Sequence, residues 1–106
     1  MSATIFEKNG TVLTVKPEGR LDSATSPVLG REVRQHLDGI QELVMDFANV
    51  EYSSSGGMRM LLEIEALMEE RHGSMRIIHA NRYILEVFDL VGFMDVVTVE
   101  QDGILL

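Results

Sequence analysis

Short apolar runs separated by helical patterns restrict the fold of this chain more than any other feature of its sequence. Residues 43–47, 75–79 and 96–99 have the length and composition of strands. Helical patterns from residue 58 to about 71 and from 81 to 90 lie between them. Strands joined through a helix pair in parallel with right-handed crossovers, so we expect an α/β sheet with helices packed on it.

The first forty residues add a hairpin and a further helix. Residues 4–8 and 11–15 alternate loosely around Asn9-Gly10, a pair that favours a type I′ turn. Three residues then interrupt the strand pattern: Pro17, Gly19 and Asp22. Leu29, Val33, Leu37 and Ile40 predict the buried face of a helix from about 27 to 37. The expected order is β-β-α-β-α-β-α-β, a mixed and mostly parallel sheet with about three to four helices.

Composition limits the classes of function. The chain has 106 residues, of which 45% are hydrophobic, and we expect a single domain over 1–106. Cysteine is absent, which fits a reducing cytoplasm and excludes a thiolate nucleophile. The start of the chain lacks the pattern of a secretory signal, and no apolar stretch approaches the roughly 18 residues of a membrane span. We therefore expect a cytoplasmic location without a membrane.

The net charge of −8 comes from 17 acidic and 9 basic residues. Nucleic-acid-binding proteins present basic surfaces to the phosphates, so this balance argues against direct DNA or RNA binding. An acidic surface can steer a small protein toward a basic patch on a protein partner.

Three serines followed by two glycines, residues 53–57, stand between a strand-like run and a helical pattern. Serine is a common helix cap, because its hydroxyl accepts a hydrogen bond from an unpaired N–H group. A helix start also favours negative charge, so the same segment suits a phosphate that is bound or attached. The sequence leaves both readings open, together with nucleotide or anion binding at Gly56-Gly57.

Catalytic patterns are missing from the sequence. The three histidines, His36, His72 and His79, accompany neither a Gly-x-Ser-x-Gly motif nor a P-loop. No histidine and carboxylate spacing makes a metal site. We expect no enzyme activity, no catalytic residue, no metal and no cofactor.

Four segments, in order, resemble a known family. They are Gly-Arg-Leu-Asp at 19–22, Val-Met-Asp-Phe at 44–47 with Val-Glu-Tyr at 50–52, residues 54–62, and residues 85–93. Together they resemble a STAS domain of the bacterial anti-sigma-factor antagonist type. The resemblance covers about residues 5–100 and implies a STAS fold.

The resemblance also implies partner switching that regulates transcription. The unmodified protein would bind an anti-sigma factor that is also a serine kinase, and phosphorylation of a loop serine would end the interaction. A serine phosphatase would reset the switch. The alternative is a phosphorylation-independent STAS scaffold, sensor or small-ligand module, and the sequence leaves the oligomeric state open.

Alignment on Gly57 places the phosphoacceptor at Ser55, with Ser54 and Ser53 as fallbacks. The residues that the resemblance assigns to partner binding are Asp22, Ser54, Gly56, Gly57, Met58 and Arg59. Two positions depart from the family's usual pattern. Ser54 stands where many members have aspartate, and Gly56 creates a Gly-Gly pair that is expected to loosen the loop.

Overall fold

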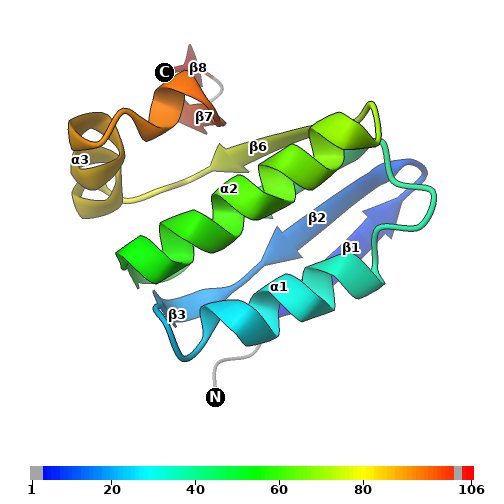
Figure 1. Ribbon diagram of the computed structural model, residues 1–106, viewed down its shortest axis with the longest axis horizontal. Helices are drawn as coiled ribbons and strands as arrows, with labels where there is room; N and C mark the ends of the chain where they lie inside the picture. Colours follow the sequence, from blue (N-terminus) through cyan, green and yellow to red (C-terminus); the bar gives the residue numbers. More distant parts are fainter. Residues whose placement is uncertain (1–3, 102–103) are drawn as a thin grey trace.

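The computed structural model describes residues 4–101 and 104–106, so positions 1–3 and 102–103 of the expected domain lie outside the described residues. The elements in chain order are β1 (Ile5–Asn9), β2 (Val12–Lys16), β3 (Glu18–Leu21), α1 (Ser26–Gln35), β4 (Glu42–Asp46), β5 (Asn49–Ser53), α2 (Ser55–Glu70), β6 (Ser74–Ile78), α3 (Arg82–Leu90), the 3-10 turn η1 (Phe93–Asp95), β7 (Thr98–Gln101) and β8 (Ile104–Leu105). Figure 1 shows α1 and α2 side by side over one face of the sheet, with α3 set beyond the end of β6.

The main sheet has six strands in the order β1-β2-β4-β6-β7-β8. The pairs β2/β4, β4/β6 and β6/β7 are parallel, whereas the outer pairs β1/β2 and β7/β8 are antiparallel. The strand predicted at 43–47 corresponds to β4, which lies in the interior of the sheet between β2 and β6. The α/β class with a mixed, mostly parallel sheet is confirmed.

The structure contains three strands that the sequence did not predict, namely β3, β5 and β8. Pro17, Gly19 and Asp22 were expected to interrupt the strand pattern, but β3 begins directly after Pro17 and contains Gly19. β3 pairs in parallel with β5 in a separate two-stranded sheet, with a register shift beside Gly19, whose φ is +82°. A glycine bulge of this kind interrupts the sequence pattern without ending the strand.

The first hairpin turns at Gly10-Thr11 instead of Asn9-Gly10, because Asn9 pairs with Val12 in the ladder. Gly10 has a φ of +62°, and Thr11 does not share this left-handed conformation. A type I′ turn needs positive φ at both central positions, whereas a II′ turn needs glycine at the first alone. The expected I′ turn was therefore wrong.

The core lies between the helices and the covered face of the main sheet. The four apolar residues predicted for the buried face of the first helix are all buried: Leu29, Val33, Leu37 and Ile40. The helical patterns of the sequence also place Leu62 and Val91 on the inner faces of their helices, but these residues are exposed, at 38% and 58%. Val91 follows the last residue of α3, so the helical pattern does not fix its direction.

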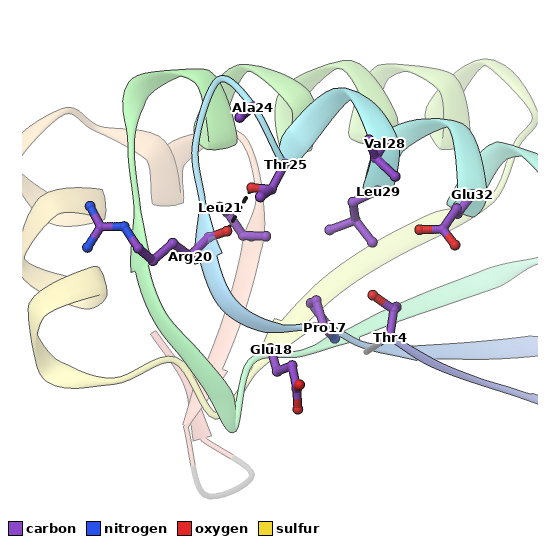
Figure 2. Close-up of a pocket in the computed structure, with 10 residues that line it drawn as sticks. All are labelled: Thr4, Pro17, Glu18, Arg20, Leu21, Ala24, Thr25, Val28, Leu29 and Glu32. Atoms are coloured by element: carbon purple, nitrogen blue, oxygen red, sulfur yellow. Dashed lines mark hydrogen bonds between the residues drawn. The ribbon is translucent and has the colours of Figure 1, made fainter. Parts of the chain in front are cut away.

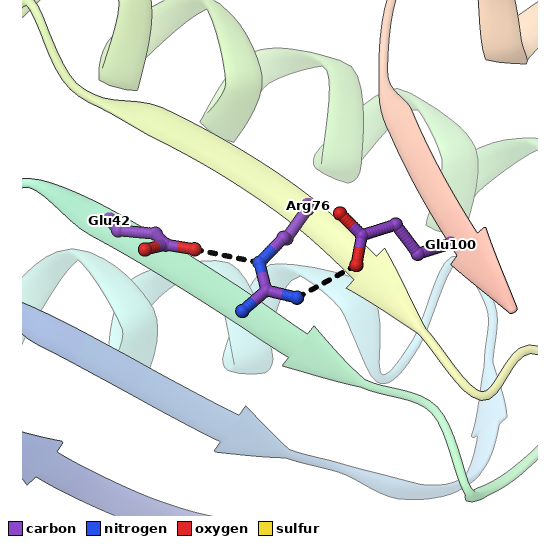
Figure 3. Close-up of polar contacts among 3 residues, drawn as sticks. All are labelled: Glu42, Arg76 and Glu100. Atoms are coloured by element: carbon purple, nitrogen blue, oxygen red, sulfur yellow. Dashed lines mark hydrogen bonds and ion pairs between the residues drawn. The ribbon is translucent and has the colours of Figure 1, made fainter. Parts of the chain in front are cut away.

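The face of the sheet opposite α1 and α2 carries an arginine between two carboxylates (Figure 3). Arg76 of β6 donates from Nε to Glu42 at 2.7 Å and from Nη1 to Glu100 at 2.9 Å. The hydrogen bond to Glu42, opposed by partial burial and aided by the charge of Glu100, holds the pKa of Arg76 above its ordinary value. These bonds join three neighbouring strands, β4, β6 and β7, on the face that lacks helices.

Candidate functional site

The candidate site forms where β3 and β5 end side by side. The last residues of the two strands, Leu21 and Ser53, are partners in the parallel ladder. The next amide, that of Ser54, donates to the carbonyl oxygen of Leu21 at 2.8 Å. This pairing brings the turn after β3 against the serine loop, although the two segments lie about thirty positions apart in the sequence.

The three serines have different environments. Ser53 is buried, and its hydroxyl donates to the carbonyl oxygen of Ser54 at 3.3 Å. Ser54 is the N-cap of α2, and its Oγ accepts a hydrogen bond from the amide of Gly57 at 3.4 Å. Ser55 is the first residue of the helix and is exposed. The capping role therefore belongs to Ser54, and the hydroxyl of Ser55 is accessible to a partner.

Helix α2 starts at Ser55, three residues before the start expected from the sequence. Gly56 and Gly57 therefore lie in its first turn, and neither has a positive φ. A Cβ at Gly57 would lie 2.5 Å from Ser53 Oγ and 2.8 Å from the carbonyl oxygen of Leu21. A Cβ at Gly56 would lie 3.3 Å from the backbone of Ser23. The expectation that the Gly-Gly pair loosens the loop was wrong, because these glycines permit close packing of the site.

Replacing Gly57 by alanine is expected to lower the free energy of unfolding by about 1–3 kcal/mol, because the new methyl group overpacks a site closed by backbone. Gly56→Ala is the matched control, since it gains the same helix propensity and has more room. Urea denaturation of both variants measures the difference. Equal stability of the two would contradict the packing role assigned to Gly57.

Asp22 organises the turn that leads from β3 to α1. Its Oδ1 accepts hydrogen bonds from the amides of Ala24 at 2.9 Å and Thr25 at 3.0 Å. These hydrogen bonds hold the pKa of Asp22 below its ordinary value, and the bond from the amide of Thr25 has the largest effect. The next residue, Ser23, contacts Gly56 through its backbone. Asp22 thus shapes the segment that packs on the serine loop.

A cavity of about 230 Å³ lies on the other side of this turn, between β3 and α1 (Figure 2). Pro17, Leu21, Val28 and Leu29 give it an apolar lining. The hydroxyl of Thr25 donates to the carbonyl oxygen of Arg20 at 2.7 Å, so it serves the turn. The side chain of Arg20 extends away from the cavity in Figure 2, and its Cζ atom lies 4.5 Å from the ring centroid of Tyr52.

Met58 and Arg59 share a cavity of about 350 Å³ with Ser55. The opposite wall comes from the segment after α3 and includes Val91 and Val96. Val91 and Val96 are 58% and 61% exposed, and Leu62 of α2 also lines the cavity. The sequence analysis assigned none of these three apolar residues to partner binding. The sequence signal that could have identified them is an apolar side chain at a position that does not contribute to the buried face of a helix.

The contacts of His36 and His79 are with residues outside the serine loop. His36 Nδ1 is 2.7 Å from the carbonyl oxygen of Glu32, and its ring stacks on Phe6. His79 Nδ1 lies 2.8 Å from Asp46 Oδ1, a pair that sequence reasoning missed. Over the described ranges 4–101 and 104–106, no cluster of three or more His, Cys, Asp or Glu residues suits a metal ion. Within the same ranges, no helix is long and apolar enough to span a bilayer.

The Asp46–His79 pair predicts how the stability of the folded protein depends on pH. Partial burial raises the pKa of Asp46, but hydrogen bonds from His79 and the amide of Ala48 outweigh it and hold the pKa below its ordinary value. A lowered folded-state pKa contributes stability above the unfolded value of about 3.9, and this stability is lost as the pH falls through the folded value. His79→Gly, which suits the φ of +62° at this position, is expected to raise the pKa of Asp46.

Carboxyl-carbon NMR titration of wild type and variant measures this pKa. Asp22 provides an internal control, because its hydrogen bonds come from its own turn and its pKa is expected to stay unchanged. An unchanged pKa of Asp46 in the variant would contradict the role given to His79.

Comparison with known proteins identifies the family. A family model described as "Mlab, STAS domain" matches residues 5–99. BtrV of Bordetella bronchiseptica, which carries the name of an anti-sigma factor antagonist, is 26% identical over 80 residues, or 74% of this chain and 69% of BtrV. The fold is similar to the crystal structure of a Thermotoga maritima protein described as an anti-sigma factor antagonist, with a TM-score of 0.86, 15% identity, and 93% and 86% of the two chains covered. It is also similar to Bacillus SpoIIAA in its phosphorylated form, with a TM-score of 0.72, 14% identity, and 94% and 93% covered. Because the family model spans almost all of the sequence, the chain belongs to the STAS domain family.

Proposed function

We propose that this chain is an anti-sigma-factor antagonist that works by partner switching. It acts as a single STAS domain over 1–106 and, when unphosphorylated, binds an anti-sigma factor that is also a serine kinase. Phosphorylation of Ser55 releases the complex, and a serine phosphatase restores the binding form. The name of the relative BtrV supports the general role. The absence of cysteine fits a cytoplasmic setting.

The exposure of Ser55 at the first position of α2 is the observation that carries this proposal. A phosphate adds about −1.5 to −2 charges, and the positive end of a helix stabilises such an anion. The fold can therefore accept the modification. The same charge in the middle of a protein interface would carry a desolvation cost and repel acidic neighbours, so it would end binding.

The proposed interface is the cavity beside Ser55, with Met58 and Arg59 as its contacts on α2. Methionine adapts its shape to a partner, and arginine offers directed hydrogen bonds. Ser54, Gly56 and Gly57 fix the start of the helix, so they act on binding by holding Ser55 in place. Asp22 acts in the same way through the turn that packs on the loop. The proposal is a binding module, with no role as an enzyme.

Intact-mass measurement after incubation with a candidate kinase and ATP tests the proposal. Wild type is expected to gain one phosphate, and Ser55→Ala is expected to gain none. Ser54→Ala is the control, because it retains the Ser55 hydroxyl and loses only the cap, at a cost of about 1 kcal/mol in stability. A phosphate that persists in Ser55→Ala would move the acceptor to Ser54 or Ser53. No phosphate from any kinase would favour the phosphorylation-independent scaffold, sensor or small-ligand module.

A further inference from the structure

A second cavity, of about 450 Å³, lies between α1 and α2, the two helices that run side by side in Figure 1. Ser26 and Pro27 from the start of α1 and Gly56 from the start of α2 contribute to its lining. Its volume falls in the range of roughly 300–1,000 Å³ typical of small-molecule sites. We call this cavity the α1–α2 groove. Arg59 lines this groove but Ser55 does not, so the groove is distinct from the cavity beside Ser55 that is proposed to bind the kinase.

Ser26 gives the first sign of a ligand. The residue is 2% exposed, and among the described residues its hydroxyl has no hydrogen-bond partner. Native structures contain few buried polar groups without a partner, and such a group indicates that a partner is missing. Ser26 lines the α1–α2 groove, so a ligand in the groove is a natural candidate for that partner.

Arginine is concentrated in the same place. Arg31, Arg34 and Arg59 line the groove, which are three of the nine basic residues in a chain of net charge −8. The one carboxylate among the described lining residues, Glu63, lies 3.6 Å from Arg34. Over the described part of the chain, the guanidinium groups of Arg31 and Arg59 have neither an ion pair nor a hydrogen bond. The groove is therefore locally positive on an acidic protein.

The start of α2 adds to this positive field. Gly56 is the second residue of α2, whereas at the start of α1 the amide of Ser26 already donates to the carbonyl oxygen of Asp22 at 2.9 Å and Pro27 has no N–H group. The first amides of a helix have no acceptor inside the helix, and their end of the helix favours anions. In α2 the amide of Gly57 is capped by Ser54, which leaves the preceding amide, that of Gly56, for another acceptor.

We propose that the α1–α2 groove binds the phosphate group of a small molecule. A phosphate offers three acceptor oxygens and up to two charges, which suits two unpaired guanidinium groups, a hydroxyl and a backbone amide. A carboxylate has fewer oxygens and a single charge, so it would leave part of this set unused. This inference does not require phosphorylation of Ser55 and assigns the groove a separate ligand.

Titration of the unphosphorylated protein followed by amide and arginine side-chain NMR tests the proposal. The probes are ribose 5-phosphate, inorganic phosphate and ribose. Both phosphates are expected to give saturable shifts at Gly56 and Arg31, and ribose is expected to give none. Tighter binding of ribose 5-phosphate would identify a phosphate monoester as the ligand, whereas equal binding would identify free phosphate; both results support the site.

Three variants make the test specific. Arg31→Gln is expected to weaken phosphate binding about tenfold, since it removes a charged hydrogen-bond donor. Ser26→Ala is expected to weaken binding about fivefold without loss of folding, because the hydroxyl has no partner in the protein. Arg82→Gln removes the same charge from α3, where Arg82 is largely exposed and pairs with Glu86 at 3.4 Å, and is expected to leave binding unchanged.

Absence of saturable shifts with either phosphate would overturn the proposal. Equal weakening by Arg31→Gln and Arg82→Gln would also overturn it, since that result indicates attraction to charge in general. Because no kinase takes part in these measurements, failure here is distinguishable from failure of the proposed switch at Ser55.

Discussion

Phe88→Ala is expected to lower the free energy of unfolding by about 3–5 kcal/mol, the usual cost of emptying a buried aromatic site. Phe88 is fully buried on α3 and stacks on Phe93, with ring centroids 4.2 Å apart. The stack joins α3 to η1, so its loss frees the segment that carries Val96 as well as leaving a cavity. Urea denaturation measures the change. For a domain of this size, each kcal/mol corresponds to about 4–8 °C in the midpoint of thermal unfolding.

Leu90→Ala provides the matched control on the same helix. Leu90 is 85% exposed, so its truncation is expected to change stability by no more than about 0.5 kcal/mol. Phe88→Ala should also weaken the proposed partner interface, because Phe93 lines the cavity beside Ser55. A Phe88→Ala variant as stable as Leu90→Ala would contradict the docking of α3 on the core.

The central sheet was predictable because its strands and helices carry regular patterns. Buried parallel strands appear as short apolar runs, and α1 shows a repeat of three and four residues on its inner face. The parallel pairing then follows from the crossover connections without further information. These arguments use spacing within one element, and such elements matched the structure to within a few residues at their ends.

Pairings between distant segments were not predictable in this way. β3 and β5 have few apolar residues, contain a glycine bulge and stabilise one another, so neither is visible alone. Asp46 and His79 meet because β4 and β6 are neighbours, and their positions in the sequence do not reveal a hydrogen bond. A pattern within one segment contains no information about the segment that it contacts.

The packing of the candidate site was not predictable from the sequence. The resemblance indicated the serine loop and helix start, yet the division of roles between Ser54 and Ser55 depends on the backbone at the cap. Gly57 was read as a source of flexibility, whereas its role is close contact with Leu21, a residue 36 positions earlier. The arginines of the α1–α2 groove come from two helices that are separately unremarkable and form a cluster only when packed.

Ser55→Asp is expected to bind the proposed kinase partner at least about tenfold more weakly than wild type and to remain folded. The carboxylate places a charge in the proposed interface, where like charges and desolvation disfavour association. In the free protein the same charge lies at the first position of α2, where a helix start stabilises an anion by about 0.3–1 kcal/mol. The thermal midpoint is therefore expected to stay equal to that of wild type or to rise slightly.

Ser55→Asn separates charge from shape, because asparagine has nearly the same size as aspartate and no charge. We expect it to bind the partner within a few-fold of wild type, as measured by titration calorimetry in low and high salt. The deficit of Ser55→Asp is expected to shrink at high salt, because salt screens repulsion between partly exposed charges. Equal weakening by both substitutions would mean that the interface excludes any larger side chain at this position. The switch would then depend on the bulk of the phosphate, and charge repulsion would lose its place in the mechanism.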